Sequence, residues 1–214
     1  MAVLAMLGCA LLALLLVVSA RLYLLLRKRV RPGRSGSVSL LVVAGSGGHT
    51  SEILRLLSCL SHAYSPTHYV VAESDTMSED KICRFEKARA KECCKSSYSI
   101  HRIPRSREVL QSWSSSVLTT LHSMFYCLIL TFKLRPDVML CNGPGTCVPV
   151  CASALLLGLL GIKKVLIVYV ESICRVETLS LSGRILYHFS DHFIVQWPSL
   201  KLKYPKSLYL GRIV

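Results

Sequence analysis

A histidine follows three glycines at the end of an apolar run, in a stretch that reads Gly45-Ser46-Gly47-Gly48-His49-Thr50. Glycines let the backbone turn tightly and approach a phosphate, and a helix that begins there directs free N–H groups at the anion. His49 could then bind a phosphate or act as a general base, or it could serve only to cap or pack the helix. A glycine turn that merely connects two elements is the simpler alternative.

The same stretch argues against several familiar nucleotide sites. Thr50 stands where the dinucleotide fingerprint needs its third glycine, and Glu73, the nearest acidic residue after the next strand, comes late for ribose binding. No lysine follows the glycines as in a P-loop, and the chain has no G-x-S-x-G sequence. No Cys/His spacing suggests a metal, so we expect no metal and no bound cofactor.

Two further groups of polar residues follow apolar runs. Asn142-Gly143-Pro144-Gly145-Thr146 forms a second glycine loop, and Glu171-Ser172 follows the β-branched run at 164–170. Glu171 and Ser172 could bind sugar hydroxyls, although Ser172 could equally cap the next turn. Arg105 and Glu108, in the segment 102–108, could form an anion-attracting rim or a solvated charged loop.

The elements that position these residues alternate between strand and helix. We predict strands at 38–44, 67–72, 98–103, 137–141, 164–170 and 192–195, and helices at 50–59, 78–91, 112–132, 147–160 and 179–189. This alternation is typical of an α/β fold with a Rossmann-like, doubly wound parallel sheet. In the order 3-2-1-4-5-6, strands one and four are neighbours, so both glycine loops converge on one crevice.

The first 26 residues are almost purely apolar and predict a transmembrane anchor at 1–26, followed by a basic linker at 27–37 and one domain at 38–214. Residues 2–20 carry no charge, and at about 1.5 Å per residue they nearly match a hydrocarbon core of about 30 Å. Six basic residues lie between 21 and 34, which predicts a lumenal N-terminus and a cytosolic domain. A cleavable signal peptide ending at Ala20 is the alternative, but its basic residues would precede the apolar run.

The net charge and the composition indicate which classes of partner the chain could bind. The net charge of +14 suits an anionic substrate or acidic lipid, whereas an aromatic content of 7% leaves few platforms for stacking on nucleic acid. The ten cysteines lack a C-x-x-C pattern and are expected to remain reduced in a cytosolic domain. The apolar helices 112–132 and 147–160 are expected to lie in the core at least in part, with a face on the bilayer as the alternative.

Several motifs together resemble one family. GSGGHT at 45–50 is similar to the glycine loop of the bacterial transferase that adds N-acetylglucosamine to lipid-linked muramyl peptide, a two-domain GT-B enzyme. The resemblance is closer to the membrane-anchor subunits of the eukaryotic UDP-N-acetylglucosamine transferase that adds the second sugar to dolichol diphosphate. It is carried by the N-terminal span, IPRSREVLQ at 103–111, RPDVMLCNGPG at 135–145, YVES at 169–172 and the tail 179–197.

The resemblance implies half of an inverting glycosyltransferase. The chain would anchor a soluble catalytic subunit at the endoplasmic reticulum membrane in N-glycan precursor synthesis, and that partner would bind most of the UDP-N-acetylglucosamine. The N-acetylglucosaminyl diphosphate of the dolichol acceptor would lie near the two glycine loops, with His49 as the candidate base. A contact with the preceding enzyme of the pathway is left open, as is a pure membrane scaffold that touches no substrate. The tail is expected to contact the partner through Tyr209, Leu210, Gly211, Arg212, Ile213 and Val214.

Overall fold

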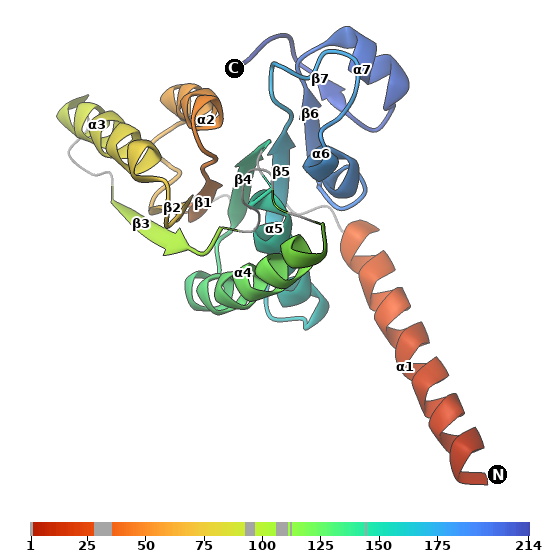
Figure 1. Ribbon diagram of the computed structural model, residues 1–214. Coiled ribbons are helices and arrows are strands. Elements are labelled where there is room, and N and C mark those ends of the chain that lie inside the picture. Colours follow the sequence, from red (N-terminus) through yellow and green to blue (C-terminus); the bar gives the residue numbers. More distant parts are fainter. Residues whose placement is uncertain (1, 28–35, 93–96, 106–110, 112, 144) are drawn as a thin grey trace.

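The computed structural model describes residues 2–27, 36–92, 97–105, 111, 113–143 and 145–214 (Figure 1). Helices and strands alternate along the chain. The helices are α1 (Ala2–Arg27), α2 (Gly48–Ser58), α3 (Thr76–Glu92), α4 (Trp113–Leu134), α5 (Cys147–Leu159), α6 (Leu181–Leu186) and α7 (Pro198–Lys203). The strands are β1 (Leu40–Val43), β2 (Thr67–Ala72), β3 (Tyr98–Ile103), β4 (Val138–Asn142), β5 (Leu166–Val170), β6 (His192–Val195) and β7 (Leu208–Tyr209).

All strand pairs are parallel, and the sheet order is β3-β2-β1-β4-β5-β6-β7. The predicted order 3-2-1-4-5-6 is therefore confirmed. In the registers of β1 and β4, Val43 pairs with Cys141, so the loops that follow these strands leave the sheet side by side. This is the position at which the winding direction reverses, where α/β proteins bind ligands.

The central strands are buried on both faces, which explains their continuous apolar sequences. Alternate side chains divide between two cores. Leu41, Val43, Met139 and Cys141 pack with α5 on one face, whereas Leu40, Val42, Val138 and Leu140 pack with α2 on the other. The eight cysteines that the structure describes are all free thiols.

The sequence prediction differs from the structure mainly near the C-terminus. The helix predicted at 179–189 is shorter, at Leu181–Leu186, because Ser180 caps its start by accepting a hydrogen bond from the Gly183 N–H. Helix α7 and strand β7 were not predicted. The short strand β7 pairs only with β6, at the edge of the sheet.

Two described helices are long and apolar enough to cross a membrane: 6–27 within α1, and 115–134 within α4. Most of α1 is exposed, with Leu25 buried near its end, and Figure 1 shows this helix projecting from the domain. Helix α4 buries Ser123 and Thr131 and exposes Leu118 and Phe125, so the expectation of partial burial is confirmed. Helix α5 turns its small residues, including Cys151 and Ser153, into the core.

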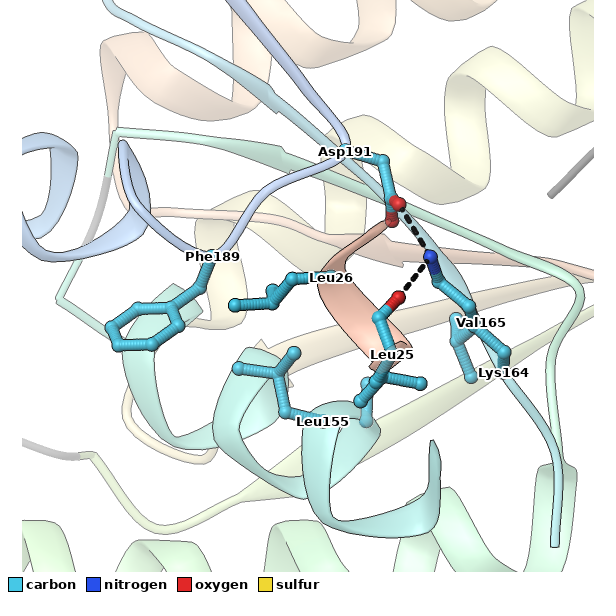
Figure 2. Close-up of a pocket in the computed structure, with 8 residues that line it drawn as sticks. Leu25, Leu26, Leu155, Lys164, Val165, Phe189 and Asp191 are labelled. Carbon is cyan, nitrogen blue, oxygen red and sulfur yellow. Dashed lines mark hydrogen bonds and ion pairs between the residues drawn. The ribbon is translucent and has the colours of Figure 1, made fainter. Parts of the chain in front are cut away.

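The last turns of α1 are attached to the domain at defined points. Lys164 donates a hydrogen bond of 2.7 Å to the Leu25 carbonyl and lies 3.0 Å from the Asp191 carboxylate (Figure 2). Arg21 donates to the Leu159 carbonyl at 3.2 Å. At Gly158 a Cβ atom would lie only 2.7 Å from Leu25 Cδ1, so a glycine here allows α1 to approach α5.

Candidate functional site

The first glycine loop is held in place by α3. The Gly45 carbonyl accepts a hydrogen bond from the buried Thr50 hydroxyl. The buried Ser78 hydroxyl lies 3.2 Å from the same carbonyl and 2.6 Å from Asp75 Oδ2, and its single proton goes to the closer carboxylate. One turn further along α3, Lys81 donates to the Gly47 carbonyl at 3.2 Å. These bonds fix the loop from behind, and Lys81 adds a positive charge beside it.

His49 lies in the first turn of α2 and meets the end of β4. Its Nδ1 atom is 3.2 Å from Asn142 Oδ1 and 3.9 Å from Glu52 Oε2. Asn142 Nδ2 in turn donates to Glu52 Oε2 at 2.9 Å and to the Val170 carbonyl at 3.4 Å. The three side chains therefore connect the first glycine loop, helix α2 and the second glycine loop in one polar network.

The network determines which nitrogen of His49 carries a proton. Both partners of Asn142 Nδ2 are acceptors, so the amide must turn its oxygen toward the imidazole. His49 Nδ1 must then be the donor, which leaves the lone pair of a neutral ring on Nε2. Among the described residues no group hydrogen-bonds to Nε2, and this nitrogen is available to a substrate hydroxyl.

Gly143 is required by the position of the imidazole. Its φ of +68° lies in the left-handed region, and a Cβ atom there would lie 2.5 Å from His49 Cε1. Gly145, by contrast, has open space where its Cβ atom would stand. The second loop thus packs directly against the candidate base.

The charges of the network are coupled. The neighbouring Glu52 carboxylate raises the pKa of His49, and this effect outweighs the burial that lowers it. Burial alone would raise the pKa of Glu52, but the nearby His49 imidazole and hydrogen bonds from Asn142 and Ser172 bring it below its usual value. His49 therefore holds its proton at a higher pH than a free imidazole does, beside a carboxylate that stays ionised.

Glu171 and Ser172 are neighbours in the sequence but hold different parts of the site. Ser172 Oγ donates to Glu52 Oε1 at 2.8 Å and so belongs to the His49 network. Glu171 is fully buried, which raises its pKa, and its carboxylate accepts bonds from the Ser172 N–H and from the N–H and hydroxyl of Ser180. Glu171 thus holds the loop between β5 and α6 in place.

These groups line a cavity of about 310 Å³. The cavity combines the first glycine loop, the second glycine loop and the loop after β5, with Arg175 as the positively charged residue in its wall. The lining residues are Gly48, His49, Glu52, Gly143, Glu171, Ser172, Cys174, Arg175 and Ser180. A diphosphate could meet backbone N–H groups and Arg175 here, while a sugar hydroxyl faces His49 Nε2.

Several other predicted site residues either do not line this cavity or are not described by the structure. Arg105 is described but does not line it, and Glu108 and Pro144 lie outside the described residues. In the tail, Tyr209 and Leu210 are exposed, whereas Val214 is buried in this chain's own core. Arg212 is exposed and stacks over Trp197, with its guanidinium carbon 4.0 Å from the ring centroid.

Glu52 and Lys81 contact the site but were not predicted from the sequence. The spacing of His49 and Glu52 places both on one face of a helix, and this H-x-x-E pattern was the available signal. Nothing in the sequence indicated that Lys81 would contact the first glycine loop, 34 residues earlier in the chain. Among the described residues, no group of three or more His, Cys, Asp or Glu side chains is arranged to hold a metal ion.

Comparison with solved structures supports the fold. The chain superposes on the crystal structure of MurG from Acinetobacter baumannii with a TM-score of 0.55 and 14% sequence identity. The match covers 82% of this chain and 45% of MurG, so the chain corresponds to about half of that protein. The GT-B half predicted from the glycine loop is confirmed at the level of the fold.

Comparison with sequences identifies the family. A family model described as "Oligosaccharide biosynthesis protein Alg14 like" matches residues 40–213. The human UDP-N-acetylglucosamine transferase subunit ALG14 is 69% identical over 83% of this chain and 84% of its own length. The subunit of the same name from Rattus norvegicus is 65% identical over 95% of this chain and 94% of its own length. The subunit from Yarrowia lipolytica is 42% identical over 86% of this chain and 84% of its own length. The chain belongs to the Alg14 family of UDP-N-acetylglucosamine transferase subunits.

Proposed function

We propose that this subunit binds the acceptor, the N-acetylglucosaminyl diphosphate of a dolichol lipid, in the cavity between the two glycine loops. The observation that carries the proposal is the His49–Asn142–Glu52 network, which holds His49 in the cavity wall and leaves its Nε2 without a hydrogen-bond partner among the described residues. The N–H groups of the first turn of α2 and Arg175 provide the positive potential that a diphosphate needs. His49 then accepts the proton of the attacking sugar hydroxyl, and transfer inverts the anomeric centre of the donor.

The donor site lies on a second, soluble subunit in this proposal. The superposition on less than half of MurG supports it, because the chain corresponds to one half of a GT-B enzyme. UDP-N-acetylglucosamine is then bound mainly by the partner, and the complete site forms when the two subunits meet. The exposed Tyr209, Leu210 and Arg212 form part of the partner contact, with Gly211, Ile213 and Val214 shaping the tail.

Helix α1 anchors the complex in the endoplasmic reticulum membrane, with its N-terminus in the lumen and the domain in the cytosol. Its apolar length and the basic residues at its end support this orientation. The assembly would thus add the second N-acetylglucosamine during synthesis of the N-glycan precursor. Contact with the preceding enzyme of the pathway remains a prediction from the family resemblance.

The variants His49→Ala and His49→Gln test the acceptor role against a pure scaffold. Transfer is measured in membranes that contain the partner, and recruitment of the partner is measured by co-purification. We expect transfer to fall at least a hundredfold while recruitment is unchanged, because general-base catalysis contributes about 10²- to 10⁴-fold. Full transfer by both variants would mean that the cavity is idle and that the chain is only a scaffold.

A further inference from the structure

An apolar groove lies beside the end of the anchor helix and runs along α5, the helix that follows the second glycine loop. One wall is the face of α5 formed by Val148, Ala152, Leu155, Leu156 and Leu159. We call this the α5–α6 groove, because Ile185 of α6 and the following Phe189 form the opposite wall, and Leu22 of α1 lies at one end. Its volume is about 310 Å³, and apolar atoms make up nearly all of its surface.

The two ends of the groove lie in different surroundings. At the membrane end, Arg21 bonds the Leu159 carbonyl, and Leu26 packs beside Leu155 and Phe189 (Figure 2). At the other end, the Val148 N–H donates to the Gly145 carbonyl at 3.2 Å, within the second glycine loop. From Val148 to Leu159 the helix rises about 16 Å, which is the length of the α5 wall between the second glycine loop and the anchor.

The opposite wall begins at the same cavity. Ser180 lines the cavity, accepts the bond from the Gly183 N–H, and starts the helix that carries Ile185. Both walls of the groove therefore start at the acceptor cavity and run toward α1. A lipid-linked acceptor with its diphosphate in the cavity has to extend its hydrocarbon chain across this distance, and water is a poor solvent for that chain.

We infer that the α5–α6 groove binds the first isoprene units of the lipid-linked acceptor. The inference rests on the proposed function, because it starts from a diphosphate held between the glycine loops. The apolar walls replace water around the chain as it leaves the bilayer beside Leu22. The groove thus makes the enzyme selective for acceptors with long isoprenoid chains over the same headgroup on a short chain.

Two variants of groove residues test the inference. Ala152→Trp fills the groove from α5, and Ile185→Gln places an amide in its wall at a side chain that is already 40% exposed. Leu118→Gln, at a 70% exposed position on α4, is the control for a polar substitution of an exposed leucine. Each variant is assayed as the full chain with its partner, in nanodiscs, with N-acetylglucosaminyl diphosphate on a long isoprenoid and on a single isoprene unit.

We expect the groove variants to raise KM for the long acceptor about tenfold and to leave KM for the short acceptor unchanged, whereas Leu118→Gln changes neither. Unchanged selectivity in both groove variants would overturn the groove assignment and leave the proposed function intact. The same holds if Ala152→Trp displaces a protein partner, which would make the groove a protein-docking site. No transfer by the wild-type complex to either acceptor would instead contradict the proposed function itself.

A photoreactive isoprenoid acceptor provides a direct readout. With the photoreactive group on the first isoprene units, cross-links are expected within 148–159 and 185–189 of the wild-type chain. Cross-links confined to the outer face of α4 would place the lipid elsewhere and overturn the inference.

Discussion

His49 and Asn142 lie 93 residues apart in the sequence, yet His49 Nδ1 and Asn142 Oδ1 are separated by 3.2 Å. The contact exists because β1 and β4 are neighbours in a parallel sheet and the loops after them leave the same edge. Asn142 also donates to Glu52, so one amide orients the candidate base and joins it to a carboxylate. This relationship leads to a prediction about pH.

Glu52→Gln should shift the pH dependence of transfer to lower pH. Because Glu52 raises the pKa of His49, its removal lets the imidazole lose its proton at a lower pH. If His49 acts as a base, transfer rises with pH through this pKa, and the rising limb of kcat/KM for the acceptor moves down in Glu52→Gln. The measurement is a pH–rate profile of both proteins with the partner present.

Glu79→Gln is the matched control, since Glu79 of α3 pairs with Arg102 of β3 and lies outside the cavity. Its profile should equal that of the wild type. Activity that falls rather than rises with pH through the His49 pKa would show that the protonated ring binds phosphate and that another group is the base.

Gly143→Ala should inactivate the site without releasing the chain from the membrane. The new Cβ atom would lie 2.5 Å from His49 Cε1, and the positive φ costs about 1–2 kcal/mol for a residue with a side chain. Transfer is expected to fall at least tenfold, and thermal unfolding in detergent should report the lower stability. Gly145→Ala adds the same methyl group to open space. An equal loss of stability in both variants would contradict the packing argument.

Thr50→Val should loosen the first glycine loop. The variant keeps the β-branched shape but removes a buried hydroxyl that donates to the Gly45 carbonyl, at a cost of about 1–3 kcal/mol. Hydrogen exchange of the amides in 45–50 should become faster, and KM for the acceptor should rise. Ser58→Ala removes an exposed hydroxyl from the same helix and should change neither quantity. Unchanged exchange in Thr50→Val would show that the Thr50 hydroxyl does not hold the loop in place.

Leu210→Asp should weaken recruitment of the soluble partner. The side chain is 62% exposed in the tail, so an aspartate leaves the fold intact and places a charge in the proposed contact. Co-purification of the partner is the measurement, with Met77→Asp on α3, at 72% exposure, as the control. Full recruitment by Leu210→Asp would exclude this part of the tail from the interface.

Much of this arrangement could be predicted from the sequence. The apolar runs before Gly45 and Asn142 gave the central strands, and the alternation of elements gave the sheet order, because parallel strands buried on both faces have few other solutions. The network partners could not be predicted as easily. Glu52 stands on a helix among other polar residues, and its role depends on the rotation of α2, which tertiary packing determines.

Local signals were also weakest at the C-terminal end. Strand β7 has only two residues, and α7 has six, too few for hydrophobic periodicity to be visible. The exposed face of α4 was also difficult to predict from the sequence. Composition alone could not show that Ser116, Ser123 and Thr131 face the core while Leu118 and Phe125 face outward.

Transfer by the reconstituted subunits is the most direct test of the central claim that this chain is the acceptor half of a two-chain transferase. Membranes that contain this chain alone are assayed with labelled UDP-N-acetylglucosamine and a lipid-linked N-acetylglucosaminyl diphosphate, and a soluble donor-binding partner is then added. We expect no transfer by either chain alone, transfer when both are present, and loss of that transfer with His49→Ala. Transfer by this chain alone would contradict the account, because the donor site would then lie within these 214 residues.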